Sequence, residues 1–196
     1  MRDNKILNVV IVHGSNKNDR ENIKKYGLAS QNERHWFLWL KNELEKRGIE
    51  CINPLMPENW NPKYPDWKEE FEKIKIDEDS ILVGYSLGAT FLVKWLGNTK
   101  KEIKKLILVA PAKVSHEGSD YIKEFYDFEI NENIKNNIRE ITIIQSNDDH
   151  DYILKSSRIY KKALGGKIIE LPGRGHFTET SMGTKEFPEL MDEILK

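Results

Sequence analysis

One serine of this chain lies in a pattern that could make it a nucleophile. Ser86 is the central residue of Gly84-Tyr85-Ser86-Leu87-Gly88, which has the form G-x-S-x-G. The apolar run 80–83 before this pentapeptide predicts a buried strand, and residues 89–96 after it predict a helix. This succession is typical of a nucleophile elbow, a tight strand-to-helix turn that leaves a serine side chain exposed above the edge of a sheet.

The glycines on either side of Ser86 agree with such a turn. Larger side chains two residues before and two residues after the serine would collide with the neighbouring strand and helix. The same pentapeptide also arises by chance in turns where the serine only caps a helix. The motif alone leaves both interpretations open, and other residues of the chain must decide between them.

Two polar loops could supply the partners that a serine nucleophile needs, namely a base and an acid that orients it. Residues 146–151 (Ser-Asn-Asp-Asp-His-Asp) follow one predicted strand, and residues 172–177 (Pro-Gly-Arg-Gly-His-Phe) follow the next. In parallel sheets such groups gather at the carboxyl ends of the strands. Serine, acid and histidine then occur in the chain order of an α/β-hydrolase triad.

His176 is the expected base, because its loop contains two glycines and lies just beyond a predicted strand, where the imidazole can reach Ser86. The alternative is an ordinary solvent-exposed loop histidine. His35 and His116 lie outside any strand-end motif and are expected at the surface.

Asp149 is the acid that the spacing favours. It precedes Tyr152 by three residues, so the acid can turn back toward the imidazole before the chain enters a helix. Asp148 is the alternative acid, and Asp151 is expected to cap the following helix.

The first strand ends in residues 10–15, Val-Ile-Val-His-Gly-Ser. A glycine at this place lets the chain turn sharply and present a backbone N–H to the oxyanion that forms in acyl transfer. The expected donors are the amides of Ser15 and of Leu87, which follows the nucleophile. His13 is expected to be structural, packed beneath this loop.

Neither a metal nor a cofactor is expected. A site made of the residues 148–151 is disfavoured, because adjacent ligands on one short turn rarely converge on an ion. The single cysteine, Cys51, excludes an intramolecular disulfide and a cysteine-based zinc cluster. It is expected to be a small buried side chain rather than a reactive thiol.

Short apolar runs alternate with amphipathic segments along the whole chain. Most of the runs lack period-two alternation, so they are expected to be buried on both faces, as parallel strands are. The pattern predicts an α/β fold with a mostly parallel sheet of about six strands and helices on both faces, a three-layer sandwich forming one domain over residues 1–196. The expected strands are 7–12, 49–53, 80–83, 106–110, 140–145 and 167–171, and the expected helices are 36–44, 67–74, 87–96, 153–164 and 187–195.

Two stretches interrupt this alternation. Residues 15–34 are polar and long for a strand-to-helix loop, and they are expected to be a functional excursion at the carboxyl edge of the sheet. Residues 113–130 contain four aromatic side chains, which indicate either a short helix covering the sheet or a small lid over a substrate pocket. Trp60, Trp67 and the aromatic residues of 125–128 suggest an apolar acyl or aryl pocket, although each could equally pack in the core.

Together these motifs resemble an α/β-hydrolase, and more narrowly the small serine hydrolases of the retinoblastoma-binding protein 9 and YdeN group. The resemblance extends over nearly the whole chain, including Trp36-Phe37-Leu38-Trp39-Leu40, Pro54-Leu55-Met56-Pro57 and Gly175-His176-Phe177. It implies a compact hydrolase core with strand order 2-1-3-4-5-6.

Carried over to this sequence, the resemblance implies Ser86 as nucleophile, Asp149 as acid and His176 as base. The chain departs from the group at two places. His150 follows the acid where a proline is common, which implies a longer acid loop, and the excursion 15–34 is longer than usual.

Composition narrows the range of partners. The 196 residues carry 31 basic and 32 acidic side chains, a formal net charge of −1, so nucleic acids and anionic membranes are not expected partners. No stretch has the length of a signal peptide core or a membrane span, and the chain is expected to be cytoplasmic.

The leading hypothesis is a serine hydrolase, carboxylesterase-like, that cleaves a small ester, thioester or amide through an acyl-enzyme on Ser86. The alternative is a protein-interaction module on a hydrolase scaffold with little or no turnover, since a fold does not determine a function. The physiological substrate, the acyl-chain preference and the oligomeric state are not readable from the residues.

Overall fold

The computed structural model describes residues 8–26 and 35–196. Within them, one six-stranded sheet has the order β2-β1-β3-β4-β5-β6, and every neighbouring pair of strands is parallel. This confirms the predicted fold class and strand order. The strands are β1 (Asn8–Val12), β2 (Glu50–Ile52), β3 (Ile81–Tyr85), β4 (Ile103–Val109), β5 (Ile138–Ser146) and β6 (Lys167–Leu171).

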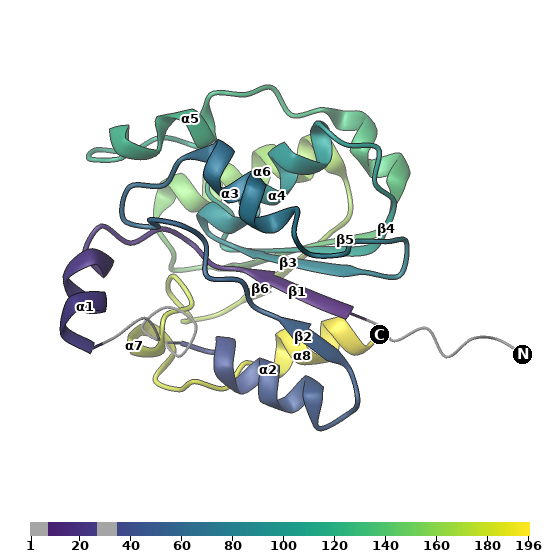
Figure 1. Ribbon diagram of the computed structural model, residues 1–196, viewed down its shortest axis with the longest axis horizontal. Coiled ribbons are helices and arrows are strands. Elements are labelled where there is room, and N and C mark those ends of the chain that lie inside the picture. The colour runs from purple at the N-terminus through teal and green to yellow at the C-terminus, as the bar shows by residue number, and fades with distance from the viewer. Residues whose placement is uncertain (1–7, 27–34) are drawn as a thin grey trace, which may run out of the picture.

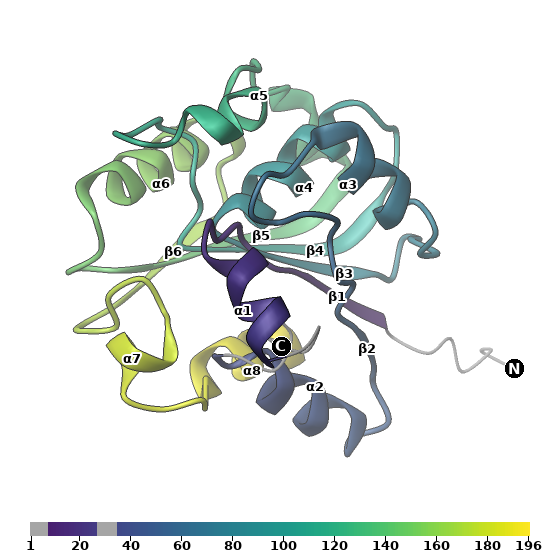
Figure 2. The same cartoon turned by 60° about the vertical axis from the view of Figure 1, so that its left-hand side comes forward.

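Helices cover both faces of this sheet (Figures 1 and 2). In both views α3, α4, α5 and α6 lie on one face, and α2 and α8 lie on the other. The α-helices are α1 (Asp19–Tyr26), α2 (Phe37–Glu45), α3 (Tyr64–Phe71), α4 (Leu87–Gly97), α5 (Lys123–Tyr126), α6 (Asp151–Leu164), α7 (Glu179–Met182) and α8 (Pro188–Leu195). Two short 3-10 turns, Asp120–Ile122 and Glu132–Asn137, complete the described elements.

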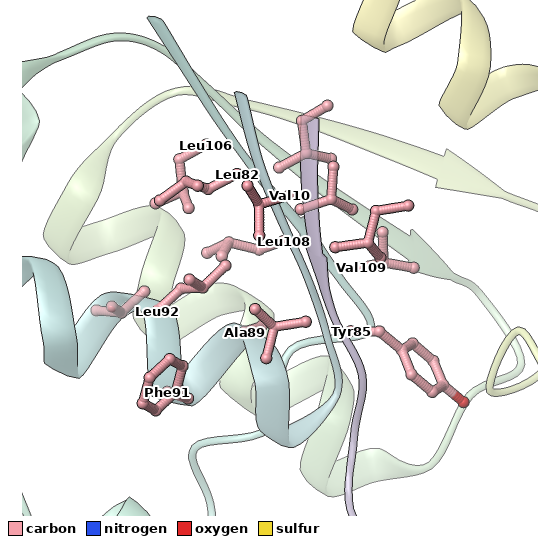
Figure 3. Close-up of a cluster of buried hydrophobic side chains, with 14 of the residues drawn as sticks. Val10, Leu82, Tyr85, Ala89, Phe91, Leu92, Leu106, Leu108 and Val109 are labelled. Atoms are coloured by element: carbon pink, nitrogen blue, oxygen red, sulfur yellow. The ribbon is translucent and has the colours of Figure 1, made fainter. Parts of the chain in front are cut away.

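The core follows from the apolar runs of the central strands. Every residue of β3 is buried, and so are four of the five residues of β1. The helix α4 is buried along almost its whole length and packs directly on β3. Figure 3 shows this contact, with Leu82 and Val10 of the strands close to Ala89 and Leu92 of α4.

The strand order places a topological switch point between β1 and β3. The chain leaves β1 toward β2 on one side, and then returns to β3 on the other side. The crevice outside the carboxyl ends of two such strands is where open α/β sheets bind ligands. The loops after β1 and β3 carry Gly14 and Ser86, so the expected oxyanion loop and the expected nucleophile meet at this point.

The helices α3 and α1 differ from the predictions, the first because of a proline in its first turn and the second because its sequence is polar. The helix α3 begins at Tyr64 rather than near residue 67, because Pro65 occupies its first turn, where the missing N–H costs nothing. The helix α1 was not predicted, since its sequence Asp-Arg-Glu-Asn-Ile-Lys-Lys-Tyr has no apolar stripe. The predicted excursion 15–34 thus contains a helix, and its residues 27–34 lie outside the described part of the chain.

None of the helices that the structure describes has the length and apolar character required to cross a lipid bilayer.

Candidate active site

Ser86 lies in the turn between β3 and α4, with a backbone φ of +52° and ψ of −114°. A positive φ is strained for a residue with a side chain, so the surrounding structure must hold it in place. Two backbone hydrogen bonds do so: the Ser86 N–H donates to the Val109 carbonyl at 2.9 Å, and the Ser86 carbonyl accepts from the Ala112 N–H at 3.2 Å. The turn is therefore fixed to the end of β4.

Three glycines allow this turn to lie close to its neighbours. A Cβ atom at Gly84 would lie 2.5 Å from the Ala89 Cα, and one at Gly88 would lie 2.1 Å from the Val12 carbonyl oxygen. A Cβ atom at Gly14 would lie 3.1 Å from the Ser86 Cβ. The absence of these three side chains lets β1, β3 and α4 meet around the serine.

The structure brings His176 and Asp149 to Ser86. The His176 Nε2 lies 3.1 Å from the Ser86 Oγ, and the His176 Nδ1 lies 3.0 Å from the Asp149 Oδ2. The Asp149 side chain has no exposed surface, and its Oδ1 accepts the backbone N–H of His150 at 2.7 Å. Hydroxyl, imidazole and carboxylate thus form one continuous chain of hydrogen-bonding groups.

The loop that carries His176 is held from two sides. The Tyr85 hydroxyl donates to the His176 carbonyl oxygen at 2.7 Å. Figure 3 shows the Tyr85 ring leaving β3 away from Ala89 on α4. On the other side of the histidine, Phe177 is fully buried and stacks on Phe187, with ring centroids 5.2 Å apart. These contacts fix the backbone on which the imidazole stands.

The loop that leads to Asp149 (residues 146–149, the acid loop) is hydrogen-bonded to the loop that carries His176 (residues 173–176, the histidine loop). The Ser146 Oγ accepts from the Arg174 N–H at 2.8 Å, and the Asp148 Oδ1 accepts from the Gly175 N–H at 2.9 Å. The Asn147 Oδ1 accepts from the Gly173 N–H at 3.1 Å. Three consecutive side chains therefore hold the histidine loop, and the next one, Asp149, reaches the imidazole.

The two candidate acids have different hydrogen-bond partners in this arrangement. Asp148 accepts hydrogen bonds from the Ser146 hydroxyl and the Gly175 amide, and these bonds hold the pKa of the Asp148 carboxyl below its usual value. Asp151 does not cap α6 as expected. It is the first helical residue, and His150 occupies the cap position without a side-chain hydrogen bond.

His13 lies beneath the loop after β1, fully buried. Its Nε2 accepts the Met56 N–H at 3.0 Å, so the neutral ring carries its proton on Nδ1, which lies 2.8 Å from the Gly14 carbonyl oxygen. Burial lowers the pKa of this imidazole, which keeps the ring neutral. His13 therefore orients the Gly14 carbonyl.

This orientation bears on the two expected oxyanion donors. In a trans peptide the carbonyl oxygen and the following N–H point in opposite directions, so the Ser15 N–H points away from His13. Within the described residues, neither the Ser15 N–H nor the Leu87 N–H donates to a protein acceptor. Gly14 approaches Ser86, Leu87 follows it directly, and Ser15 and Leu87 line the same cleft as Ser86.

A cleft of about 320 Å³ opens above Ser86. Tyrosine, histidine and hydroxyl side chains dominate its wall, and residues of the stretch 113–130 form one side of it. Its lining consists of Gly14, Ser15, Asn16, Lys17, His35, Tyr85, Ser86, Leu87, Ala112, His116, Tyr121, Ile122, Tyr126, Tyr152, His176 and Thr178.

The cleft is more polar than the aromatic residues of the sequence suggested. Trp67 and Phe125 are fully buried and pack against each other in the core, with ring centroids 5.1 Å apart. Trp60 and Phe128 also lie outside the cleft lining. For Trp67 and Phe125 the structure therefore bears out the alternative of core packing, and none of these four aromatic side chains lines the cleft.

Two histidines expected at the surface contribute to the cleft wall. His35 is half-buried, and its Nδ1 accepts the Glu179 N–H at 3.0 Å. His116 is exposed at the rim and stacks on Tyr152, with ring centroids 4.2 Å apart. These residues could not be predicted as part of the site, because no local motif marks them. They come from loops far apart in the chain that meet only in the folded structure.

The parallel sheet with this strand order, and a serine at its switch point, define the class of α/β-hydrolases. The chain belongs to the serine hydrolase family, whose model matches residues 25–195. Within this family it falls in the YdeN-type group, as the sequence resemblance implied.

The similarity to known relatives extends over most of the chain. YdeN of Bacillus subtilis (strain 168) is 24% identical over 174 residues, which cover 86% of this chain and 91% of YdeN. The crystal structure of the ydeN gene product matches with a TM-score of 0.83 and 22% identity over 96% of both chains. Est1E from Butyrivibrio proteoclasticus matches with a TM-score of 0.66 and 13% identity, over 98% of this chain and 87% of Est1E.

Proposed function

We propose that the chain is a serine hydrolase of the carboxylesterase type, which cleaves a small ester, thioester or amide with Ser86 as nucleophile, His176 as base and Asp149 as orienting acid. The observation that carries this proposal is the unbroken contact from the Ser86 hydroxyl through the imidazole to a carboxylate without exposed surface. Such an arrangement activates a hydroxyl that is otherwise a poor nucleophile at neutral pH.

The first half of the reaction forms an acyl-enzyme. The Ser86 Oγ attacks the carbonyl carbon while the His176 Nε2 accepts the hydroxyl proton. The Asp149 carboxylate faces the Nδ1–H of the resulting imidazolium and stabilises its charge. When the tetrahedral intermediate collapses, the bond to the leaving group breaks, and the proton passes from Nε2 to the departing oxygen, sulfur or nitrogen.

The second half repeats these steps with water. His176 takes a proton from a water molecule, which attacks the acyl carbon, and returns that proton to the Ser86 Oγ when the ester bond to the enzyme breaks. The Ser15 and Leu87 amides are the proposed donors to both oxyanions. A donor of this kind contributes about 3 kcal/mol to the stability of a transition state.

Hydrolysis of p-nitrophenyl acetate by purified variants tests this function. We expect the Ser86→Ala and His176→Ala variants each to lose at least about a thousandfold in kcat/KM. Ser157→Ala is the matched control, because the Ser157 hydroxyl is buried without a hydrogen-bond partner among the described residues. A broad ester panel without turnover by the folded wild type would contradict the proposal and favour an interaction role.

A cytoplasmic location, a single domain and the absence of nucleic-acid partners stay predictions from the sequence.

A further inference from the structure

The cleft above Ser86 is lined by basic and hydroxyl-bearing side chains. Among the described residues of its wall, Lys17 carries an ammonium group and none is a carboxylic acid. The wall also contains the imidazoles of His35, His116 and His176.

The carboxylates near this wall either lie outside the cleft lining or contact a basic side chain. Asp149 has no exposed side-chain surface and contacts His176. Glu179 lies 3.6 Å from the Lys185 amine, outside the lining. The positive charge of the cleft is therefore not balanced by an acid within its described wall.

Three further exposed acids, Glu117, Asp120 and Asp151, are sequence neighbours of lining residues. None of them belongs to the cleft lining. Exposed charges outside a cleft are well solvated, and water and salt weaken their effect on a ligand within it.

Lys17 lies two residues beyond the proposed oxyanion donor Ser15, so their Cα atoms are at most about 7 Å apart. Its amine lies 4.6 Å from the centroid of the Tyr121 ring and donates a hydrogen bond to the Gly118 carbonyl oxygen. The Tyr121 hydroxyl in turn lies 3.2 Å from the Ser15 Oγ. These contacts hold the exposed ammonium group at the cleft wall.

An ammonium group has three N–H donors, and the Gly118 carbonyl takes one of them. The other two can bind an anionic group of a ligand. Burial raises the pKa values of Tyr121, Tyr126 and Tyr152, so their hydroxyls stay protonated at neutral pH and can also donate. The wall thus offers a cation together with neutral donors, which is the chemistry that recognises a carboxylate.

We propose that the cleft selects small esters that carry a carboxylate, and that Lys17 is the residue that determines this specificity. The inference rests on the proposed hydrolase function and names its substrate class. The volume of about 320 Å³ is sufficient for a compact acid.

Two matched pairs of esters test the inference: 4-acetoxybenzoate with its methyl ester, and monophenyl terephthalate with its methyl ester. The first pair has the charge on the leaving group and the second has it on the acyl group. In both acids the carboxylate is para to the ester, so it cannot reach the ester intramolecularly. The quantity compared is the ratio of kcat/KM for the acid to kcat/KM for its methyl ester.

We expect Lys17→Met to lower this ratio about fivefold in at least one pair, since an exposed ion pair near 4 Å contributes about 1 kcal/mol. The change should appear mainly in KM of the acid, and Lys17→Arg should keep most of the ratio. Added salt should lower the wild-type ratio in the same pair. Lys162→Met, which removes an exposed lysine from the last turn of α6, should leave the ratio unchanged.

Equal ratios for the wild type and Lys17→Met in both pairs, with the methyl esters still hydrolysed, would overturn the inference and leave the proposed function standing. A wild type that hydrolyses none of the four esters and does not react with a fluorophosphonate would contradict the proposed function, and the inference with it.

Discussion

At the scale of single residues, two adjacent aspartates have different partners. Asp149 contacts the imidazole of His176, whereas Asp148 holds the backbone of the histidine loop at Gly175. The sequence alone favoured Asp149 on spacing and kept Asp148 as an alternative, because neighbouring side chains on a loop can point in either direction. The hydrogen bonds between the acid loop and the histidine loop determine which of the two aspartates faces the imidazole.

The same substitution at both aspartates distinguishes the two roles. We expect Asp149→Asn to lower kcat for p-nitrophenyl acetate at least about a hundredfold, because the amide cannot stabilise the imidazolium. Asp148→Asn should lower kcat less than about tenfold, since an amide oxygen can still accept the Gly175 N–H. Equal losses in the two variants, measured by steady-state kinetics on folded protein, would reject this division.

At the scale of elements, the elbow depends on the close approach of α4 to β1. Gly88 lies where a Cβ atom would be 2.1 Å from the Val12 carbonyl oxygen, so no side chain fits without moving a strand. The sequence allowed this packing to be predicted, because the G-x-S-x-G pattern is local. The polar helix α1 and the four-residue helix α7 were not predicted, because neither has a run of apolar residues long enough to show a helical period.

Gly88→Ala should destabilise the protein by about 3 kcal/mol, through steric overlap with the backbone of β1. Gly97→Ala is the control within the same helix, because its Cβ atom would meet only the Asn131 Cβ at 3.4 Å. Alanine there should be neutral or stabilise by up to about 1 kcal/mol. Urea unfolding at neutral pH measures both, and similar stabilities of the two variants would contradict the packing described.

The loop after β1 should make stability depend on pH through His13. Burial lowers the folded-state pKa of His13, whereas the unfolded chain has an ordinary histidine pKa of about 6.5. Between these two values the unfolded state binds a proton that the folded state does not. The free energy of unfolding therefore has its full His13 contribution above about pH 6.5 and loses it as the pH falls below that value.

Urea unfolding between about pH 7.5 and pH 5 measures this effect. A His13→Gln variant should be less stable at neutral pH and should lose less stability on acidification than the wild type. His150→Gln, at an exposed position, should follow the wild-type pH dependence. Parallel pH profiles of the wild type and His13→Gln would show that His13 does not carry the effect.

At the scale of the whole molecule, strands and catalytic motifs were more predictable than the cleft. Strand ends, glycines and the order of Ser86, Asp149 and His176 are encoded in short stretches of sequence. The cleft wall joins segments more than a hundred residues apart, as in the contact between Ser15 and Tyr121. Such contacts depend on how β1 and the stretch 113–130 are placed around the sheet, which no local pattern specifies.

The assignment of Ser86 as nucleophile is tested most directly by the mass of the intact protein after reaction with a fluorophosphonate, followed by mapping of the modified peptide. We expect one adduct per chain, located on Ser86, absent from Ser86→Ala and present in Ser157→Ala. A folded wild type that forms no adduct, or an adduct on another residue that persists in Ser86→Ala, would contradict this assignment.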